Sequence, residues 1–326
     1  MALSRLPKAT RYMEVSMLRG INVVCYTTTN VVYSWMAKNP GQSVVLTLAS
    51  LYADSWHLCD IGDSSRPTAT HSIVICTYGR PESLIETLQS LSKQTCKNFE
   101  VVLITEKGNL SQLRQKGLES ATGDLVSFID DDVYCPPGWA QSITQSFREG
   151  VLGVTGPTII TAEYRRNRDI FKYSFWKKVH DHLFLGRLKR YPGRLSSCGC
   201  PSMRSNDEDC RYEGEVDYLE ACNMSVRRKE ALDAGGFDRI FYKTSEWCEV
   251  DLALQLKKKG VLLYNQRCLL YHRPSEQGIY ASRLSTAHRW DNFKHFQKKW
   301  VKVSLRRHLY WAWVWIYLKL KETQTI

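Results

Sequence analysis

Between residues 71 and 160, short apolar runs alternate with amphipathic stretches. The runs Ser72–Cys76, Phe99–Ile104 and Leu125–Ile129 have the length and composition of buried strands. Residues 81–91 and 113–121, which lie between these runs, are predicted to form helices. This order predicts a parallel sheet wrapped by helices, with ligands bound beyond the carboxyl ends of the strands.

Three adjacent aspartates, Asp130, Asp131 and Asp132, directly follow the third run. Neighbouring carboxylates repel one another and destabilise the fold unless a cation neutralises them. The alternative is a loop of solvated acids. Because the carboxyl end of a buried parallel strand is where ligands bind, we favour a ligand site over that alternative.

The two ends of the chain differ from this middle part. Residues 1–70 are low in charge and show no heptad or alternating pattern, so we treat them as an N-terminal extension of unknown role that ends in a linker at residues 64–68. Residues 165–194 are basic and aromatic, which suits either an amphipathic surface helix or a membrane-contacting helix. Residues 301–326 predict a basic, Trp-rich helix, either docked on the core or anchored at a membrane interface.

Composition narrows the class of protein. Of 326 residues, 43% are hydrophobic and 24% charged, which excludes a disordered chain. The formal net charge of +12 favours an anionic partner such as phosphate groups, nucleic acid or an acidic membrane surface. We expect no nucleic-acid partner, because the sequence contains no helix-turn-helix, zinc-finger or RRM signature. We also find no stretch as apolar as a membrane span of about 20 residues requires.

The 11 cysteines are scattered along the chain, which favours reduced thiols in a cytosolic protein. Cys198, Cys200 and Cys210 are the exception, because they lie close together in the sequence. They lack the paired spacing of zinc knuckles, so a metal site and a local disulfide both stay open for them.

Five segments between His71 and Trp300 match the motifs of one known family in their order and spacing. They are SIVICTYGRPESLIETLQSLSKQT, FEVVLITEKGN, LRQKGLESATGDLVSFIDDD, LEACNMSVRRKEALDAGGFDRIF and EWCEVDLALQLKKKG. This part of the chain resembles the family 2 glycosyltransferases. The resemblance implies the GT-A fold, an α/β, Rossmann-like fold whose mostly parallel central sheet is flanked by helices. It also implies a nucleotide-sugar half at residues 71–160 and an acceptor and catalytic half at residues 161–300.

The implied reaction moves a sugar from a nucleotide-diphospho-sugar to a hydroxyl acceptor, with a divalent cation, Mg²⁺ or Mn²⁺, stabilising the leaving diphosphate. The resemblance implies that Asp132 is the closer metal ligand and that Asp130 lies nearer the ribose or sugar. His272 follows a predicted strand and is a candidate additional ligand. The other candidate donor-binding residues are Thr77, Tyr78, Arg80, Glu106, Arg114 and Asp131.

The attacking hydroxyl needs a general base. In the family this base is the Asp of a Glu-Asp pair, and the outcome is inversion; here Cys248 and Glu249 stand at these positions. We expect Glu249 to be the base, with Asp251 and Glu246 as alternatives, while a helix-capping role is the other interpretation of Asp251. A second departure is Thr105, which replaces an acid of the family's nucleotide-reading pair, so the nucleotide stays open.

The acceptor class is also open: a glycan, a lipid-linked sugar or a protein. The basic aromatic segments favour a lipid-linked or cell-envelope acceptor, and a cytoplasmic protein at the inner face of the membrane. The alternative function is a non-catalytic protein that binds anionic ligands or nucleic acid on a degenerate GT-A fold, which the net charge and the departures at Thr105 and Cys248 suggest. A sugar-1-phosphate nucleotidylyltransferase is disfavoured, because residues 76–82 do not supply the Gly-rich loop that such enzymes need.

Overall fold

The computed structural model describes residues 12–18, 21–26, 58–59, 70–160, 175–207, 209–273 and 287–323. The predicted linker at residues 64–68 and the first part of the basic aromatic segment, residues 165–174, lie outside these ranges.

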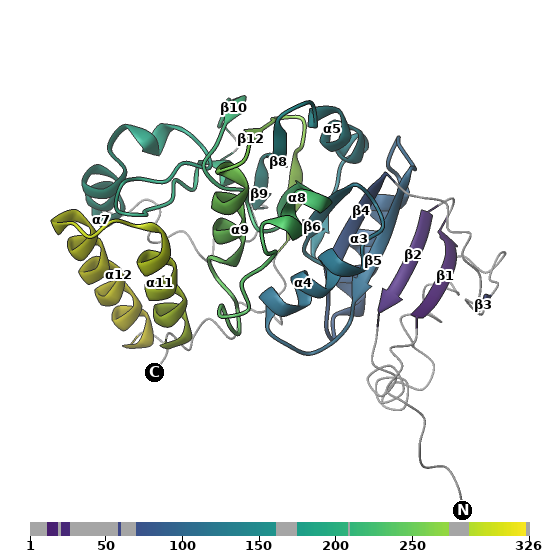
Figure 1. Cartoon of the computed structure of the whole chain (residues 1–326), viewed down its shortest axis with the longest axis horizontal. Coiled ribbons are helices and arrows are strands. Elements are labelled where there is room, and N and C mark those ends of the chain that lie inside the picture. The colour runs from purple at the N-terminus through teal and green to yellow at the C-terminus, as the bar shows by residue number, and fades with distance from the viewer. Residues whose placement is uncertain are drawn as a thin grey trace, which may run out of the picture.

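A ten-stranded sheet runs through the molecule (Figure 1). Relative to the other strands, β10, β11 and β1 run in the opposite direction, so the sheet is mostly parallel and the predicted fold class is confirmed. In spatial order the strands are β10 (Gly214–Glu215), β12 (Val261–Tyr264), β8 (Val151–Thr155), β11 (Asn223–Arg227), β6 (Leu125–Ile129), β4 (His71–Cys76), β5 (Phe99–Ile104), β2 (Ile21–Tyr26), β1 (Tyr12–Leu18) and β3 (Leu58–Cys59).

The helices that flank this sheet are α3 (Pro81–Ser92), α4 (Leu110–Ser120), α5 (Trp139–Ser146), α8 (Arg228–Asp233) and α9 (Cys248–Lys257). The helices α7 (Phe175–His180), α11 (Ala287–Trp300) and α12 (Leu305–Thr323) lie at one end of the molecule (Figure 1). A π-helical turn at Asp181–Leu185 and 3-10 turns at Gly186–Arg190 and Arg204–Asn206 lie between α7 and β10.

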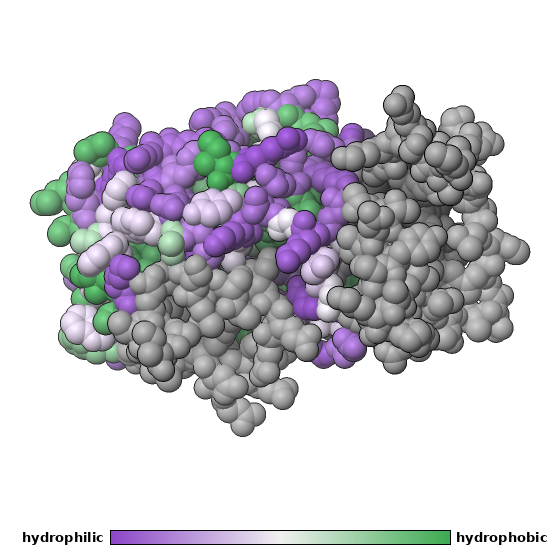
Figure 2. All heavy atoms as spheres, turned by 90° about the horizontal axis from the view of Figure 1, so that it is seen from below, coloured by the Kyte–Doolittle hydropathy of each residue, from purple (hydrophilic) through white to green (hydrophobic). Residues whose placement is uncertain are grey.

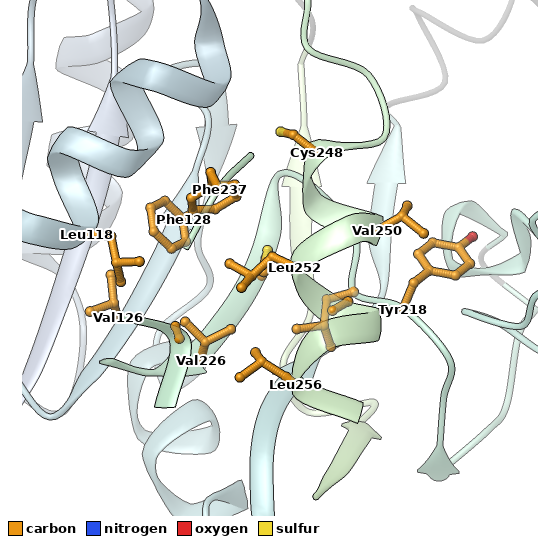
Figure 3. Packing of buried hydrophobic residues seen from close by; sticks show 14 of the residues in the cluster. Leu118, Val126, Phe128, Tyr218, Val226, Phe237, Cys248, Val250, Leu252 and Leu256 are labelled. Carbon is orange, nitrogen blue, oxygen red and sulfur yellow. The ribbon is translucent and has the colours of Figure 1, made fainter. Parts of the chain in front are cut away.

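The central strands are apolar on both faces because helices cover both sides of the sheet. Along β4, Val74 joins one core cluster while Ile73 and Ile75 join another, as the alternation of a strand requires. Side chains of α4, α8 and α9 close the first cluster, among them Leu118 and Leu252, which point toward the strands in Figure 3. Side chains of α3 and α5 close the second cluster.

A second, three-stranded sheet positions residues beside the end of β6. Its order is β7 (Val133–Tyr134), β13 (Leu270–His272) and β9 (Thr158–Ile160). Because β13 runs antiparallel to β7, His272 pairs with Val133, the residue that follows Asp132. His272 therefore lies within its strand, close to the aspartates, and does not follow the strand.

The strands and helices predicted between residues 71 and 160 are present, with α4 beginning three residues earlier than expected. The pattern of residues 1–70 does not predict β1, β2 and β3, which extend the sheet beyond β5. At the other end, α12 docks on the body of the protein, since its Tyr310 packs with Phe184 and Phe293. None of the helices in the described ranges is both long and apolar enough to cross a bilayer.

The cysteines between residues 70 and 273 that the structure describes are free thiols. Cys198 and Cys200 are buried in the core cluster beneath α12, where the sulfur of Cys200 lies 3.5 Å from Nε2 of His180. Among the described residues, Cys198, Cys200 and Cys210 form neither a disulfide nor a group with the geometry of a metal site.

Candidate active site

The three aspartates leave the carboxyl end of β6 beside the turn that follows β4. These two strands are parallel neighbours, so their ends meet at the same edge of the sheet. Thr77 donates a hydrogen bond of 2.5 Å from Oγ1 to Oδ2 of Asp131, and Arg80 forms ion pairs with both Asp131 and Asp132. The turn reverses at Gly79, whose φ of +69° favours glycine.

Asp131 points into the protein and has no exposed surface. Burial raises the pKa of its carboxyl group to about 7, although Arg80 and the hydrogen bond from Thr77 oppose this shift. Asp131 therefore ties the two strand ends together, whereas the side chain of Asp130 is 34% exposed and accessible to a ligand.

His272 completes this edge from the second sheet. Its Nε2 lies 3.1 Å from Oδ1 of Asp132 and 3.8 Å from Oδ2 of Asp130. Its Nδ1 lies 3.9 Å from the sulfur of Cys222. Burial lowers the pKa of His272, but the sulfur of Cys222 and the two carboxylates outweigh burial and hold this pKa well above its usual range.

The side-chain atoms at this edge are of the kinds that serve as ligands of divalent cations. Asp130 and Asp132 offer carboxylate oxygens and His272 an imidazole nitrogen, which together suit Mn²⁺ and related ions. Ligand atoms of Asp130, Cys222 and His272 all lie within 4.8 Å of one another. The residues present therefore fit a divalent metal, and the structure brings the three predicted ligands together.

Arg114 connects this edge with α9. One guanidinium nitrogen lies 3.9 Å from Oδ1 of Asp130, and the other lies 3.7 Å from Oε2 of Glu249 and 3.5 Å from the sulfur of Cys248. The side chain is buried in α4, which packs closely on β4: any side chain larger than hydrogen at Gly117 would overlap Val74. The buried guanidinium group of Arg114 thus lies close both to Asp130, a predicted donor-binding residue, and to Glu249, the predicted base.

Glu249 lies in the first turn of α9, after a segment of strained backbone. Lys243, Ser245 and Trp247 all have positive φ, and Trp247, at 82°, is the residue from which the helix starts. Such conformations cost about 1–3 kcal/mol each and are concentrated at functional sites. Packing holds the segment in place, since the Trp247 ring stacks on Phe296 at 4.4 Å between centroids.

The two alternative acids bind α11 and not the aspartates. Asp251 is buried and accepts hydrogen bonds from Nε1 of Trp300 at 2.6 Å and from Nζ of Lys299 at 2.9 Å. Nε of Arg289 donates a bifurcated hydrogen bond to the two carboxylate oxygens of Glu246, at 2.9 and 3.1 Å. The capping interpretation of Asp251 does not describe these contacts, which fix α9 against α11.

The remaining predicted residues surround the strand-end turns. Glu106, after β5, forms an ion pair with Lys116 of α4. Thr105 has a buried hydroxyl oxygen without a hydrogen-bond partner among the described residues. Tyr78 is 51% exposed and lies beside Arg80 in the turn after β4. These side chains border the same edge of the sheet.

Sequence reasoning missed two residues of the site, Cys222 and Glu220. Both precede β11, whose antiparallel register pairs Asn223 with Ile129 and so places Cys222 beside Asp130. Glu220 is buried and accepts a hydrogen bond from Ser205; burial raises the pKa of its carboxyl group to about 7. The available signal was that Glu220 and Cys222 stand directly before the run that forms β11. The sequence does not show that this strand runs antiparallel to β6, which brings Cys222 to the aspartates.

The chain is similar to known glycosyltransferases. Residues 104–210 match the model of glycosyl transferase family 2, a span that includes the three aspartates. The chain is 25% identical over 196 residues to a glucosyl-dolichyl phosphate glucuronosyltransferase of Haloferax volcanii, covering 51% of this chain and 55% of that protein. It is 26% identical over 133 residues to the uncharacterized glycosyltransferase YwdF of Bacillus subtilis, covering 32% of this chain and 50% of that protein.

The chain thus spans about half the length of these curated relatives. Among solved structures, a mannosyltransferase from Pyrobaculum calidifontis in complex with GDP-mannose and Mn²⁺ aligns with a TM-score of 0.47 and 12% identity. That alignment covers 85% of this chain and 77% of the mannosyltransferase.

Proposed function

This chain belongs to glycosyl transferase family 2, and on that premise we propose that it transfers a sugar from a nucleotide-diphospho-sugar to a hydroxyl acceptor, with inversion at the anomeric carbon. One observation carries the proposal: Asp130, Asp132 and His272 converge at one edge of the sheet, and Arg114 connects that edge with Glu249. A nucleotide diphosphate needs positive charge around its phosphates, and an acceptor hydroxyl needs a carboxylate to take its proton. This edge of the protein offers both.

On the donor side, Arg80 and Arg114 offer guanidinium groups to the diphosphate, and the exposed face of Asp130 borders the ribose and sugar. Asp132, Asp130 and His272 would hold a divalent cation, Mg²⁺ or Mn²⁺. When bound, this cation supplies positive charge that stabilises the leaving diphosphate. Asp131 and Thr77 position Arg80 and the loop from within the protein.

On the acceptor side, Glu249 is the general base. Its carboxylate takes the proton of the acceptor hydroxyl while the hydroxyl oxygen forms a bond to the anomeric carbon. The bond from that carbon to the diphosphate breaks at the same time, and its electron pair leaves with the diphosphate. Attack on the face opposite the leaving group gives inversion. Arg114 positions Glu249 relative to Asp130.

A lipid-linked acceptor is the class that we favour. The Haloferax volcanii relative is named for a glucosyl-dolichyl phosphate substrate, which is a sugar on a lipid carrier. In this chain, a cavity of about 200 Å³ lies beside the strained segment that precedes α9. It is lined by Glu246 and Trp247 of that segment, by Phe293 of α11, and by Tyr310 and Trp313 of α12. Aromatic walls of this kind suit an apolar chain or a sugar face.

The outer face of α12 suggests that the protein works at a membrane surface. Leu305, Leu309, Ala312, Ile316 and Leu320 are all exposed. At about 100° per residue they lie within a sector of about 80° on the helix. The opposite face carries the buried Tyr310 and Leu318, so the apolar stripe points away from the protein.

Neighbouring elements extend this stripe. Phe175 and Trp176 of α7 are 71% and 60% exposed, and Trp176 lies 6.2 Å from Trp313 between ring centroids. Figure 2 shows hydrophobic residues gathered at the end of the molecule where Figure 1 places α7 and α12. Apolar and basic residues together suit a surface of anionic lipids. Exposed basic side chains of this region include Lys178, Arg187, Lys189 and Arg190, and Arg306 and Lys319 of α12.

Transfer of a labelled sugar from UDP-, GDP- and dTDP-sugars to a lipid extract tests the proposed activity. We expect one donor class to label the extract, and Asp132→Ala to lose all transfer while remaining folded. Asp124→Ala, which changes an exposed aspartate after α4, is the matched control and should retain transfer. Full transfer by Asp132→Ala would sink the metal assignment.

A further inference from the structure

Cys222 is a buried thiol that faces the same imidazole as the aspartates. Cys222 and His272 are 8% and 4% exposed, and the sulfur lies 3.9 Å from Nδ1 of His272. Among the residues that the structure describes, Asp130, Cys222 and His272 are the group of acids, histidines and cysteines whose ligand atoms converge within 4.8 Å. The group thus offers one oxygen, one nitrogen and one sulfur.

The position of the sulfur is set by the next residue. Asn223 is fully buried at the start of β11, where its side-chain amide donates to the carbonyl of Cys268 at 2.8 Å and accepts a hydrogen bond from Nε1 of Trp139 at 3.1 Å. Its backbone pairs with Ile129 at the end of β6. Two strands and three side-chain contacts, including one to Pro157, therefore hold Cys222 beside Asp130.

These separations are close to those of a metal site. Bonds of about 2.3 Å to sulfur and about 2.1 Å to nitrogen or oxygen allow two ligands of one cation to lie at most about 4.4 Å apart. The upper limit of 4.8 Å for Asp130, Cys222 and His272 exceeds this value by only a few tenths of an ångström. Because the side chain of Asp130 is 34% exposed, a small movement of that carboxylate is enough to close the difference.

We propose that the sulfur of Cys222 binds the divalent cation of the donor site, together with Asp130 and His272, and that it makes this site select a transition-metal ion over Mg²⁺. A thiolate is a soft ligand, whereas Mg²⁺ takes oxygen ligands in a strict octahedron. As the metal–sulfur bond forms, the thiol releases its proton to solvent. The inference rests on the proposed function for the use of the cation, but ligation by sulfur is measured without any transfer.

Cobalt absorption is the direct test, because Co²⁺ bound to a thiolate has an intense sulfur-to-metal charge-transfer band in the near ultraviolet, and Co²⁺ bound only to oxygen and nitrogen does not. We would titrate the full chain with Co²⁺ and follow binding in parallel by calorimetry. The band is expected in the wild type and in Cys96→Ser, a change to a partly exposed thiol after α3, and is expected to be absent in Cys222→Ser. Bound Co²⁺ without the band in the wild type would overturn the proposal, as would a band that persists in Cys222→Ser.

Selectivity gives a second readout. We expect the ratio of Co²⁺ affinity to Mg²⁺ affinity to fall at least about tenfold in Cys222→Ser, since loss of an outer-shell partner alone typically costs 10–100-fold in metal affinity. An unchanged ratio contradicts the proposal. If the variants fail to fold, the wild-type band alone decides the question. A wild type that shows the band but transfers no sugar would count against the proposed function and leave the ligation intact.

Discussion

Arg114 reaches Glu249 and Asp130 with the two ends of one guanidinium group, at 3.7 and 3.9 Å. Asp130 follows a strand of the sheet, and Glu249 lies in the first turn of α9, so this single buried side chain joins the donor edge to the proposed base. The positive charge of Arg114 therefore lies between Asp130, a proposed metal ligand, and Glu249, the proposed base.

Arg114→Ala should destabilise the protein. Removing one member of a buried ion pair leaves uncompensated charge, which typically costs 3–5 kcal/mol, and we expect roughly 3 kcal/mol here because both distances are long. Urea denaturation measures the change. Arg239→Ala, at a guanidinium that is 68% exposed, is the control and should stay within about 0.5 kcal/mol of the wild type. A loss of under about 1 kcal/mol for Arg114→Ala would show that the pairs contribute little.

Glu249→Gln should abolish transfer while donor binding is retained. The amide keeps the shape of the side chain but cannot take the proton, and a positioned base contributes about 10²–10⁴-fold to the rate. Steady-state transfer and donor calorimetry on the same preparation separate the two effects. The control is Glu149→Gln, an exposed glutamate before β8, which should behave as the wild type. Unimpaired turnover by Glu249→Gln would require another base.

Asp251→Asn should affect stability more than chemistry. This carboxylate is buried and holds Lys299 and Trp300, so the variant loses charge-assisted hydrogen bonds worth about 1.5–3 kcal/mol each. We expect a lower urea midpoint and near-normal turnover per folded molecule. If turnover collapses while stability is unchanged, Asp251 acts in catalysis and the assignment of the base to Glu249 fails.

The burial of His71 in its neutral form should make the protein less stable in mild acid. Burial lowers the pKa of this histidine from 6.5 to about 4, so the folded protein keeps it neutral while the unfolded chain binds a proton below pH 6.5. The stability from neutral His71 is present above that pH and is lost as the pH falls toward 4, by roughly 3 kcal/mol in total. Urea titrations between these pH values should show a smaller loss for His71→Gln than for the wild type and the exposed control His308→Gln. Equal losses in all three proteins would contradict the assignment.

Replacing apolar residues of the exposed stripe on α12 with charged ones should release the protein from membranes. We expect the wild type to sediment with vesicles that contain phosphatidylglycerol and less with vesicles of phosphatidylcholine alone, because apolar contact and basic charge act together. Leu309→Glu combined with Ile316→Glu should abolish this binding. Ile240→Glu is the control, since Ile240 is 62% exposed but lies outside α7 and α12. Binding that survives the double change would place the contact elsewhere.

Local patterns predicted the part of the fold that they determine. The apolar runs that became β4, β5 and β6 are buried on both faces, so their identity and their order could be predicted, and with them the position of Asp130–Asp132 at the ligand-binding edge. The strands β1 and β2 could not, because residues 1–70 show no alternating pattern.

The parts of the site that escaped prediction depend on contacts between distant segments. Cys222 lies near Asp130 only because β11 runs antiparallel to β6, and a short apolar run does not encode its direction. Asp251 precedes an apolar helical stretch, as a capping residue would, but contacts with Lys299 and Trp300 of α11 determine its role. The register of β13 against β7 likewise places His272 beside Asp132.

Metal-dependent binding of a nucleotide-sugar is the property that best tests the proposed function. We would measure thermal stabilisation of the wild type by UDP-, GDP- and dTDP-sugars, once with Mn²⁺ and once with EDTA. A donor at 100 times its dissociation constant stabilises the folded state by about 2.7 kcal/mol. We expect one nucleotide class to stabilise the protein, and only when the metal is present. A folded protein that no donor stabilises under either condition would contradict the proposed use of a nucleotide-diphospho-sugar.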